Sequence, residues 1–275
     1  MNDIEAGKLE KLKQFFLQKG SAAIAFSGGV DSTFLVKVAY EVLGNKALAI
    51  TLVSNSFPER ERNAAVEFCK TLGITQVEIN YDELEIPGFA ENPQDRCYIC
   101  KKALFKMIQN TAQSKGITTV CEGSNMDDTG DYRPGMRAIK EMGVESPLQV
   151  AELTKQEIRN ISKEYNLPTW DKPSLACLAT RFVYGETITK EKLIMVGKAE
   201  QLLVDLGFSQ MRVRLHGNIA RIELLPQDFP RFMEDNIRTK VYQQLKSFGF
   251  SYVTLDLLGF KSGSMNLNIN KKRAD

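Results

Sequence analysis

Apolar and polar positions follow two different patterns along roughly the first 165 residues of the chain. Short apolar runs are typical of strands, and the stretches between them carry apolar residues at the spacing of a helix that buries one side. Thr154 and Glu157 form a capping box that predicts the start of one such helix, ending near Tyr165. The predicted strands occupy residues 22–26, 47–53, 76–79 and 118–122, and the predicted helices include 59–72 and 101–112. Alternating strands and helices predict an α/β fold with a doubly wound parallel sheet.

The pattern changes after residues 172–185. From there it predicts, in order, a helix over 190–206, strands over 211–216 and 219–224, a helix from about 228 to 248, and a strand over 252–257. Gly217 and Asn218 separate the two consecutive strands and predict a hairpin turn. This order is typical of a smaller α+β domain. We therefore expect two domains, residues 1–183 and 184–275.

Composition excludes several classes of protein. With 275 residues, of which 43% are hydrophobic and 25% charged, the chain can bury a core without disulfide bonds or a structural metal. Its 36 basic and 34 acidic residues leave a net charge of +2, which argues against a broad nucleic-acid-binding surface. No apolar run approaches the roughly 20 residues that span a membrane. Residues 1–12 lack the features of a signal peptide, so we expect a cytoplasmic protein.

The five cysteines are an odd number, and in a reducing compartment they are free thiols rather than a disulfide framework. Cys69 on the apolar side of a helix and Cys121 in a buried strand are expected to be core residues. Cys97 and Cys100 form a CxxC pair ahead of a helix at Lys101, a pattern shared by zinc sites, redox dithiols and iron–sulfur sites.

Cys177 is the natural third partner of the CxxC pair, because its segment connects the two predicted domains. A 4Fe–4S cluster normally takes four cysteines. Three cysteines would leave one iron open, where an exogenous sulfide could bind.

A glycine-containing loop follows the first predicted strand and leads into a helix. Its sequence is Ser27-Gly28-Gly29-Val30-Asp31-Ser32-Thr33. Two glycines allow close approach of the backbone, while the helix N-terminus and the three hydroxyls can donate to a phosphate. Asp31 would repel a phosphate unless a cation lies between them, so it implies Mg²⁺. The loop lacks the lysine of a Walker motif and the G-x-G-x-x-G pattern, and a plain strand-to-helix turn capped by Ser or Asp is the alternative.

The predicted hairpin concentrates positive charge on one of its faces. With a two-residue turn, position 214 faces 221 and 212 faces 223, so one face carries Arg212, Arg214, His216 and Arg221. Two arginines opposite each other are unfavourable on an empty sheet, whereas a phosphate or carboxylate ligand would reverse the sign. An anion site and a solvated face both fit this pattern. His216 is the only histidine, and its place beside the turn assigns it no role.

The glycine loop resembles the PP-loop of the N-type ATP pyrophosphatases, which implies a Rossmann-like domain that binds ATP. Further segments resemble the LarE family along essentially the whole chain: residues 131–135, 181–185, 212–214, 220–224, 252–257, and Gly259 with Phe260. The resemblance implies AMP transfer from ATP to the carboxylates of pyridinium-3,5-biscarboxylic acid mononucleotide. Sulfur then replaces AMP, in the synthesis of the nickel-pincer nucleotide cofactor of lactate racemase.

The resemblance also implies roles for single residues. Ser27, Gly28, Gly29, Ser32 and Thr33 would bind pyrophosphate, and Asp31 with Mg²⁺ would offset its charge. Residues 51–53 would lie near the adenosine. Arg212 and Arg214 would hold the substrate phosphate, with further contributions from Arg133 and Arg181, and Glu200 would face the same site.

The source of sulfur divides the LarE family into two branches. One branch uses a sacrificial cysteine, at a position that carries Ala176 in this chain. The other holds a 4Fe–4S cluster on three cysteines, which correspond to Cys97, Cys100 and Cys177. The resemblance therefore favours the cluster branch, with ATP, Mg²⁺ and the cluster as cofactors, an unidentified sulfide donor and a homo-oligomeric state. A tRNA thiolase, an amidotransferase synthetase half and a non-catalytic nucleotide-binding module are the rival hypotheses.

Overall fold

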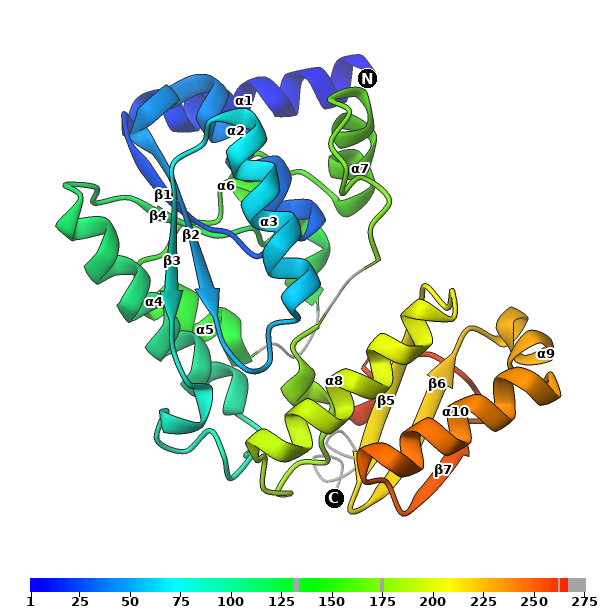
Figure 1. Ribbon diagram of the computed structural model, residues 1–275. Helices are drawn as coiled ribbons and strands as arrows, with labels where there is room; N and C mark the ends of the chain where they lie inside the picture. Colours follow the sequence, from blue (N-terminus) through cyan, green and yellow to red (C-terminus); the bar gives the residue numbers. More distant parts are fainter. Residues whose placement is uncertain (131–133, 174–175, 262, 267–275) are drawn as a thin grey trace. The chain divides into compact units, whose positions relative to one another are not determined.

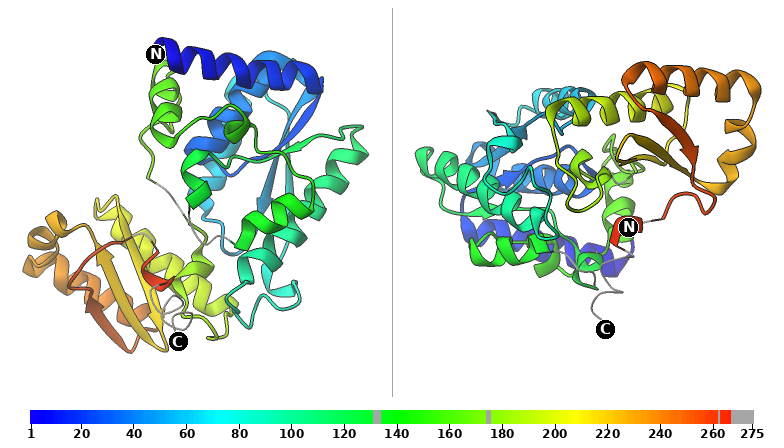
Figure 2. Two further views of the ribbon diagram at one scale, coloured as in Figure 1. Left: turned by 180° about the vertical axis from the view of Figure 1, so that it is seen from behind. Right: turned by 90° about the horizontal axis from the view of Figure 1, so that it is seen from below.

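A computed structural model describes residues 1–130, 134–173, 176–261 and 263–266. Its contacts divide the chain into two compact units (Figures 1 and 2). Unit 1 contains Met1–Ile86 and Asp95–Leu175, and unit 2 contains Pro87–Gln94 and Ala176–Asp275. Residues 87–94 join unit 2 through backbone hydrogen bonds, from Gly185 to the Asn92 carbonyl and from Ile188 to the Ala90 carbonyl. No helix within the described residues is long and apolar enough to cross a membrane.

Unit 1 is built on a four-stranded parallel sheet in the order β3-β2-β1-β4. Its strands are β1 (Ala22–Ala25), β2 (Ala47–Val53), β3 (Gln76–Asn80) and β4 (Val120–Cys121). All four lie where the apolar runs predict them. Since neighbouring strands are parallel, the carboxyl ends of β1, β2 and β4 meet at one edge of the sheet, where open α/β sheets bind their ligands.

Helices cover both faces of this sheet. One face packs against α1 (Asp3–Lys19), α2 (Val30–Leu43), α3 (Glu59–Leu72), α6 (Pro147–Val150) and α7 (Lys155–Glu164). The other packs against α4 (Arg96–Ser114) and α5 (Pro134–Glu141). Alternate residues of a strand point to opposite faces, so in β1 Ile24 belongs to the first core and Ala23 to the second. The predicted doubly wound α/β architecture is confirmed.

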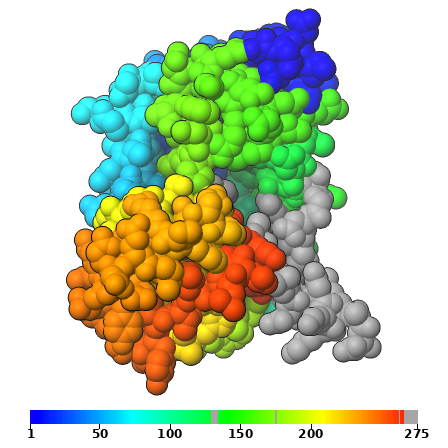
Figure 3. All heavy atoms as spheres, turned by 90° about the vertical axis from the view of Figure 1, so that its right-hand side faces the viewer, coloured from blue at the N-terminus to red at the C-terminus, as the bar shows by residue number. Residues whose placement is uncertain are grey.

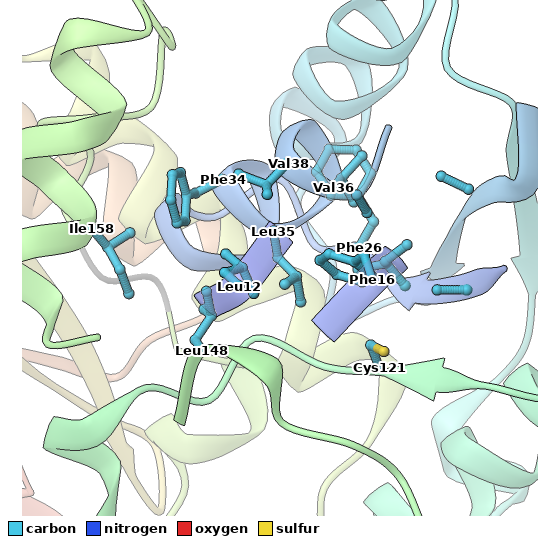
Figure 4. Packing of buried hydrophobic residues seen from close by; sticks show 14 of the residues in the cluster. Leu12, Phe16, Phe26, Phe34, Leu35, Val36, Val38, Cys121, Leu148 and Ile158 are labelled. Atoms are coloured by element: carbon cyan, nitrogen blue, oxygen red, sulfur yellow. The ribbon is translucent and has the colours of Figure 1, made fainter. Parts of the chain in front are cut away.

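The larger core brings together apolar side chains from segments far apart in the sequence. Leu12 of α1, Leu35 of α2, Leu148 of α6 and Ile158 of α7 are fully buried there and point toward one another (Figure 4). Burying each such side chain contributes about 1.5–3 kcal/mol. This packing fixes the starts of α2 and α7 relative to the sheet.

The two cysteines expected in the core lie there. Cys69 is 1% exposed and Cys121 is fully buried in the same apolar cluster. Burial raises the pKa of the Cys69 thiol to about 12, and it also raises the pKa of Cys121. Both thiols therefore stay protonated and unreactive near neutral pH.

Unit 2 carries a three-stranded sheet in the order β5-β6-β7. Strands β5 (Met211–His216) and β6 (Ile219–Leu224) form the predicted hairpin, with Arg212 opposite Glu223 and Arg214 opposite Arg221. Strand β7 (Tyr252–Leu255) pairs parallel to β6. Helix α8 (Lys190–Asp205) precedes the hairpin.

The single helix predicted over about 228–248 is wrong. Two helices replace it, α9 (Phe229–Phe232) and α10 (Asp235–Phe248), because the backbone of Glu234 is extended at ψ 136° and interrupts the helix. Atoms of these two helices, coloured orange, cover much of the face of unit 2 that is seen in Figure 3.

Candidate functional site

The glycine loop (residues 27–33) joins the end of β1 to the start of α2 (Figure 1). Gly28 has a φ of +68°, and a Cβ there would lie 3.2 Å from the Cβ of Ala65, so the loop needs glycine at this position. Gly29 is the N-cap of α2, and no described side chain caps the helix at this end. The loop therefore presents a helix N-terminus without a side-chain cap, which is the arrangement that binds phosphate.

The hydroxyls of the loop differ in their surroundings. Ser27 and Ser32 share a hydrogen bond of 3.2 Å between their Oγ atoms, and the Ser32 hydroxyl also donates to the Gly29 carbonyl. Thr33 is fully buried, and its hydroxyl has no hydrogen-bond partner among the described residues. Ser27 is the most exposed of the three and the best placed of them to meet a ligand.

Asp31 lies in the first turn of α2 at the centre of a polar cluster. Its Oδ1 accepts from the Asn125 amide nitrogen at 3.1 Å, and its Oδ2 accepts from Lys155 Nζ at 2.5 Å. Asn125 follows β4, and Gly123, between them, passes so close that a Cβ there would lie 3.3 Å from the Cβ of Asp31. Asp127 accepts from the Lys155 backbone N–H. A partly exposed carboxylate flanked by further oxygen donors has the chemistry that Mg²⁺ prefers.

A second lysine reaches the loop from residues before Cys177. Lys172 Nζ donates to the Gly28 carbonyl at 3.0 Å and pairs with Glu61 at 2.5 Å. The guanidinium of Arg159 holds the backbone of this segment by donating to the carbonyls of Trp170 and Lys172, both at 2.7 Å. Lys172 lies five residues before Cys177 in the sequence, and its side chain therefore bonds this part of the chain to the backbone of the glycine loop.

Sequence reasoning missed Asn125, Lys155 and Lys172. Asn125 has a visible signal, because it follows a predicted strand, and strand ends of a parallel sheet gather at one edge. Lys155 is the first residue of the helix that the capping box predicts, and this box is present as expected. Thr51, proposed to lie near the adenosine, is buried and its hydroxyl donates to the Phe26 carbonyl.

Cys97 and Cys100 are the second and fifth residues of α4, which begins at Arg96 rather than at the predicted Lys101. The helix starts earlier because the Asp95 carbonyl accepts from the backbone N–H groups of Tyr98 and Ile99. A separation of three residues then places both thiols on the same side of the helix. Both are partly exposed.

Cys177 belongs to unit 2 and is exposed. It directly precedes a short 3₁₀ helix, Leu178–Arg181. In neither unit, within the described residues, do three or more His, Cys, Asp or Glu side chains gather as a metal site. The donor chemistry nevertheless suits iron, because all three candidate thiols are accessible while the other two are sealed in the core.

Arg181 is 1% exposed and is held by Glu200 of α8. Its Nε donates to Glu200 Oε1 at 2.8 Å and its Nη2 to Oε2 at 2.9 Å. Its remaining nitrogen, Nη1, donates to the carbonyls of Ala176 at 3.0 Å and Cys177 at 3.2 Å. Glu200 also accepts from the Val213 backbone N–H, so the pair fixes the backbone around Cys177 to strand β5.

Glu223 neutralises the arginine-rich face of the hairpin. It is fully buried and accepts from Arg214 at 3.0 Å and from Arg221 at 2.9 Å. The expected repulsion between Arg214 and Arg221 is therefore offset within the strand pair itself, and no external anion is needed for that purpose. Sequence reasoning placed Glu223 opposite Arg212 and considered neither its diagonal contact to Arg214 nor its contact to Arg221 on the same strand.

Arg212 lies in the same group of charges. It is 6% exposed, its Nη1 donates to the Met211 carbonyl at 2.6 Å, and its guanidinium stands 5.1 Å from the centre of the Phe260 ring. Burial, followed by the positive charge of Arg181, lowers the pKa of Arg212 to about 10. An anion would stabilise this cation. Of the other proposed phosphate ligands, Arg181 and Arg214 lie in the same unit, and Arg133 lies outside the described residues.

Comparison with known proteins shows what this chain resembles as a whole. Residues 10–118 match the NAD synthase family. An uncharacterised protein of Synechocystis is 47% identical over 264 residues, which are 96% of this chain and 98% of that protein. The pyridinium-3,5-bisthiocarboxylic acid mononucleotide synthase of Lactiplantibacillus plantarum is 38% identical over 249 residues, 90% of each chain. A glutamine-hydrolysing GMP synthase component of Thermoplasma volcanium is 29% identical over 64% of this chain and 60% of its own length.

Proposed function

Because the chain belongs to the LarE-like family of PP-loop ATP pyrophosphatases, we propose that it is an ATP-dependent sulfurtransferase of nickel-pincer nucleotide cofactor synthesis. Its substrate is pyridinium-3,5-biscarboxylic acid mononucleotide, and both carboxylates become thiocarboxylates. The observation that carries this proposal is the 38% identity to the Lactiplantibacillus synthase over 90% of both chains, which includes parts of both units. The similarity to GMP synthase covers a smaller share of either chain.

The first step uses the glycine loop. A carboxylate oxygen of the substrate attacks the α-phosphorus of ATP, and the bond from that phosphorus to the oxygen bridging to the β-phosphorus breaks. The products are an acyl adenylate and pyrophosphate. The N-terminus of α2 and the Ser27 hydroxyl would bind the departing pyrophosphate, and Asp31 would hold the Mg²⁺ that offsets its charge.

The second step replaces AMP by sulfur. Hydrosulfide attacks the acyl carbon, AMP leaves with the electrons of the broken carbon–oxygen bond, and a thiocarboxylate remains. Cys97, Cys100 and Cys177 would hold a 4Fe–4S cluster, which when bound supplies an iron without a protein ligand where sulfide can be carried. Ala176 has no sulfur to donate, so delivery by a sacrificial cysteine at that position is not open to this chain.

Unit 2 would hold the substrate. Arg212 is a buried arginine in the same group of charges as Arg181 and Arg214, and its guanidinium has the forked geometry that binds a phosphate monoester. Arg214 is already bonded to Glu223 and would contribute charge rather than a new bidentate contact. Arg181 would act at a distance, by fixing the backbone of Cys177 through its bonds to the carbonyls of that segment.

The reaction itself is the test of the proposed function. The protein is prepared without oxygen and incubated with Mg-ATP, sulfide and pyridinium-3,5-biscarboxylic acid mononucleotide. We expect release of AMP and pyrophosphate that depends on this substrate, and a mass increase of the substrate from replacement of oxygen by sulfur. Release that depends instead on transfer RNA would support the rival thiolase hypothesis. AMP and pyrophosphate release that ignores both substrates would refute the sulfurtransferase.

The cluster has a separate test that does not depend on turnover. An anaerobic preparation should be brown and should contain close to four irons per chain. Cys97→Ser, Cys100→Ser and Cys177→Ser should each lose iron. Cys69→Ala is the matched control, because its thiol is sealed in the core and its loss should leave the iron content unchanged. A colourless protein that transfers sulfur would refute the cluster.

A further inference from the structure

The turn that follows β4 lies directly against the start of α2. Gly123 in this turn comes so close that a Cβ there would lie 3.2 Å from the backbone nitrogen of Ser32 and 3.3 Å from the Cβ of Asp31. Two residues later, the side-chain amide of Asn125 donates to Oδ1 of Asp31 at 3.1 Å. The position of this turn therefore decides how the Asp31 carboxylate is oriented.

Asn125 is itself held on all sides, with only 3% of its surface exposed. Its side-chain oxygen accepts from the Asp127 backbone N–H at 2.9 Å, so its amide nitrogen is the atom that faces Asp31. Its own backbone N–H donates to Asp128 at 3.0 Å, and its carbonyl accepts from Gln149 at 3.1 Å. An aspartate at this position would turn a second negative charge toward Asp31, whereas the amide of asparagine donates to it.

A buried carboxylate keeps this turn in shape. Glu122 directly follows β4 and is 7% exposed. Both of its oxygens accept from the Ser124 backbone N–H at 3.1 Å. One of them also accepts from the Ser124 hydroxyl at 2.7 Å, and the other accepts from the Ser146 hydroxyl at 2.5 Å. These bonds satisfy the buried carboxylate, and they close the turn one residue before Asn125.

We propose that Glu122 is a positioning residue for the metal ion that accompanies the nucleotide. Glu122 fixes the turn that carries Asn125, and Asn125 fixes one oxygen of Asp31, so the Asp31 carboxylate keeps a single orientation in which to hold Mg²⁺. The bonds of Glu122 described above all go to residues outside the glycine loop, so it acts through the turn and not by touching the nucleotide. This inference rests on the proposed binding of Mg-ATP at the loop, and not on the identity of the sulfur acceptor.

The gain in nucleotide affinity that Mg²⁺ gives distinguishes positioning of the metal from a purely structural role. The probe is the ATP analogue in which a methylene group replaces the oxygen between the α- and β-phosphorus, because it cannot be cleaved there. Its affinity is measured by isothermal titration calorimetry with Mg²⁺, and again with the metal removed by EDTA. In Glu122→Gln one of the two accepting oxygens becomes a donor, so the turn loses part of its bonds. The gain from Mg²⁺ should fall about tenfold, while the affinity without metal should change less than about twofold.

Further variants make this test specific. Glu122→Gln combined with Asn125→Ala should lose no more of the gain than Asn125→Ala alone, because Glu122 acts through Asn125. Glu5→Gln is the matched control: Glu5 is another buried carboxylate of unit 1, 4% exposed and bonded to Asn160, and its loss should leave the gain unchanged. If Glu122→Gln fails to fold by circular dichroism, Ser124→Ala replaces it, which removes one bond to the carboxylate and should lower the gain about threefold.

The outcomes separate this inference from the proposed function. A wild-type protein that does not bind the analogue, or binds it no better with Mg²⁺, would overturn both. A clear gain from Mg²⁺ in the wild type would leave the proposed function standing, and either of two results would then overturn the positioning role. One is a gain in Glu122→Gln that equals that of the wild type, even if both affinities fall together, since this would show a structural role alone. The other is a double variant that loses more of the gain than Asn125→Ala.

Discussion

Arg181 offers the sharpest prediction about what holds unit 2 together. Replacing it by Met removes two bonds to Glu200 and leaves that carboxylate buried, with the Val213 N–H as its remaining donor among the contacts described above. Breaking a buried ion pair by removing one partner costs about 3–5 kcal/mol. A domain is stable by only about 5–15 kcal/mol, so Arg181→Met should lose a large share of the unfolding free energy of unit 2.

Two further variants show whether the buried charge causes this loss. In Arg181→Met with Glu200→Met, no charge is left unpaired, although the Val213 N–H loses its acceptor at a cost of roughly 1–3 kcal/mol. The double variant should therefore be more stable than Arg181→Met. Arg238→Met is the control, because its partner on α10, Asp235, is 90% exposed, and removing that surface pair should cost less than about 1 kcal/mol.

The measurement must report on unit 2 alone, because the two units need not unfold together. Unfolding in urea can be monitored by the hydrogen exchange of peptides that cover β5, which reports on unit 2 alone. A loss below about 1 kcal/mol for Arg181→Met would refute the reasoning. A double variant that is no more stable than Arg181→Met would also refute it. If Arg181 acted as a substrate ligand instead, the variant would keep its stability and raise the KM.

Two smaller predictions concern unit 1. Gly28→Ala and Gly20→Ala both force a non-glycine residue to a positive φ, +68° and +70°, and each should cost about 1–2 kcal/mol by urea unfolding. Only at Gly28 does the new Cβ meet a neighbour, so only Gly28→Ala should also weaken ATP binding in a calorimetric titration, and equal ATP affinities would contradict this. Hydrogen bonds from the Asn160 side chain and the Asn2 backbone lower the pKa of Glu5 below its ordinary value of 4.5. The ionised Glu5 therefore stabilises the folded protein fully above its unfolded pKa, and this stabilisation is lost as the pH falls through its folded pKa. Glu5→Gln should flatten the acid side of a plot of Tm against pH, and an unchanged slope would contradict this prediction.

The elements of the fold were predictable where a single local signal decided them. Strand β2 and helix α3 have the predicted bounds, because an unbroken apolar run and a one-sided helical pattern leave few alternatives. The start of α4 was not predictable in this way. Arg96 and the two cysteines show no apolar periodicity, and a backbone contact to Asp95 begins that helix.

The partners of Asp31 depend on the order of the strands, which one sequence does not reveal. Asn125 reaches Asp31 because β4 pairs with β1, its neighbour in the sheet but not in the sequence. Lys155 arrives on a helix that lies still further along the chain. Local patterns predicted the strand end and the capping box separately, and the topology brought them together.

In the hairpin the strand register was predicted correctly, but the ion pairs between its side chains were not. Arg214 does face Arg221, as expected. Side chains on a strand also reach diagonal neighbours and the next residue on the same face, and Glu223 bonds in these two ways to Arg214 and to Arg221. A pairing argument confined to residues directly opposite each other therefore overstated the need for an anion at this face.

The segment of residues 172–181 links the two halves of the proposed chemistry, and each of its ends is fixed by a different charge. At one end Lys172 bonds to the Gly28 carbonyl, part of the loop where pyrophosphate would leave. At the other end Arg181 donates to the carbonyls of Ala176 and Cys177, and its guanidinium is itself held in place by Glu200. The start of this segment is thus bonded to the glycine loop of unit 1, and the backbone at Cys177 is anchored to the core of unit 2. A cysteine proposed to hold a cluster must be exposed and must also be fixed in position. The exposed Cys177, on a backbone bonded to a buried ion pair, meets both conditions.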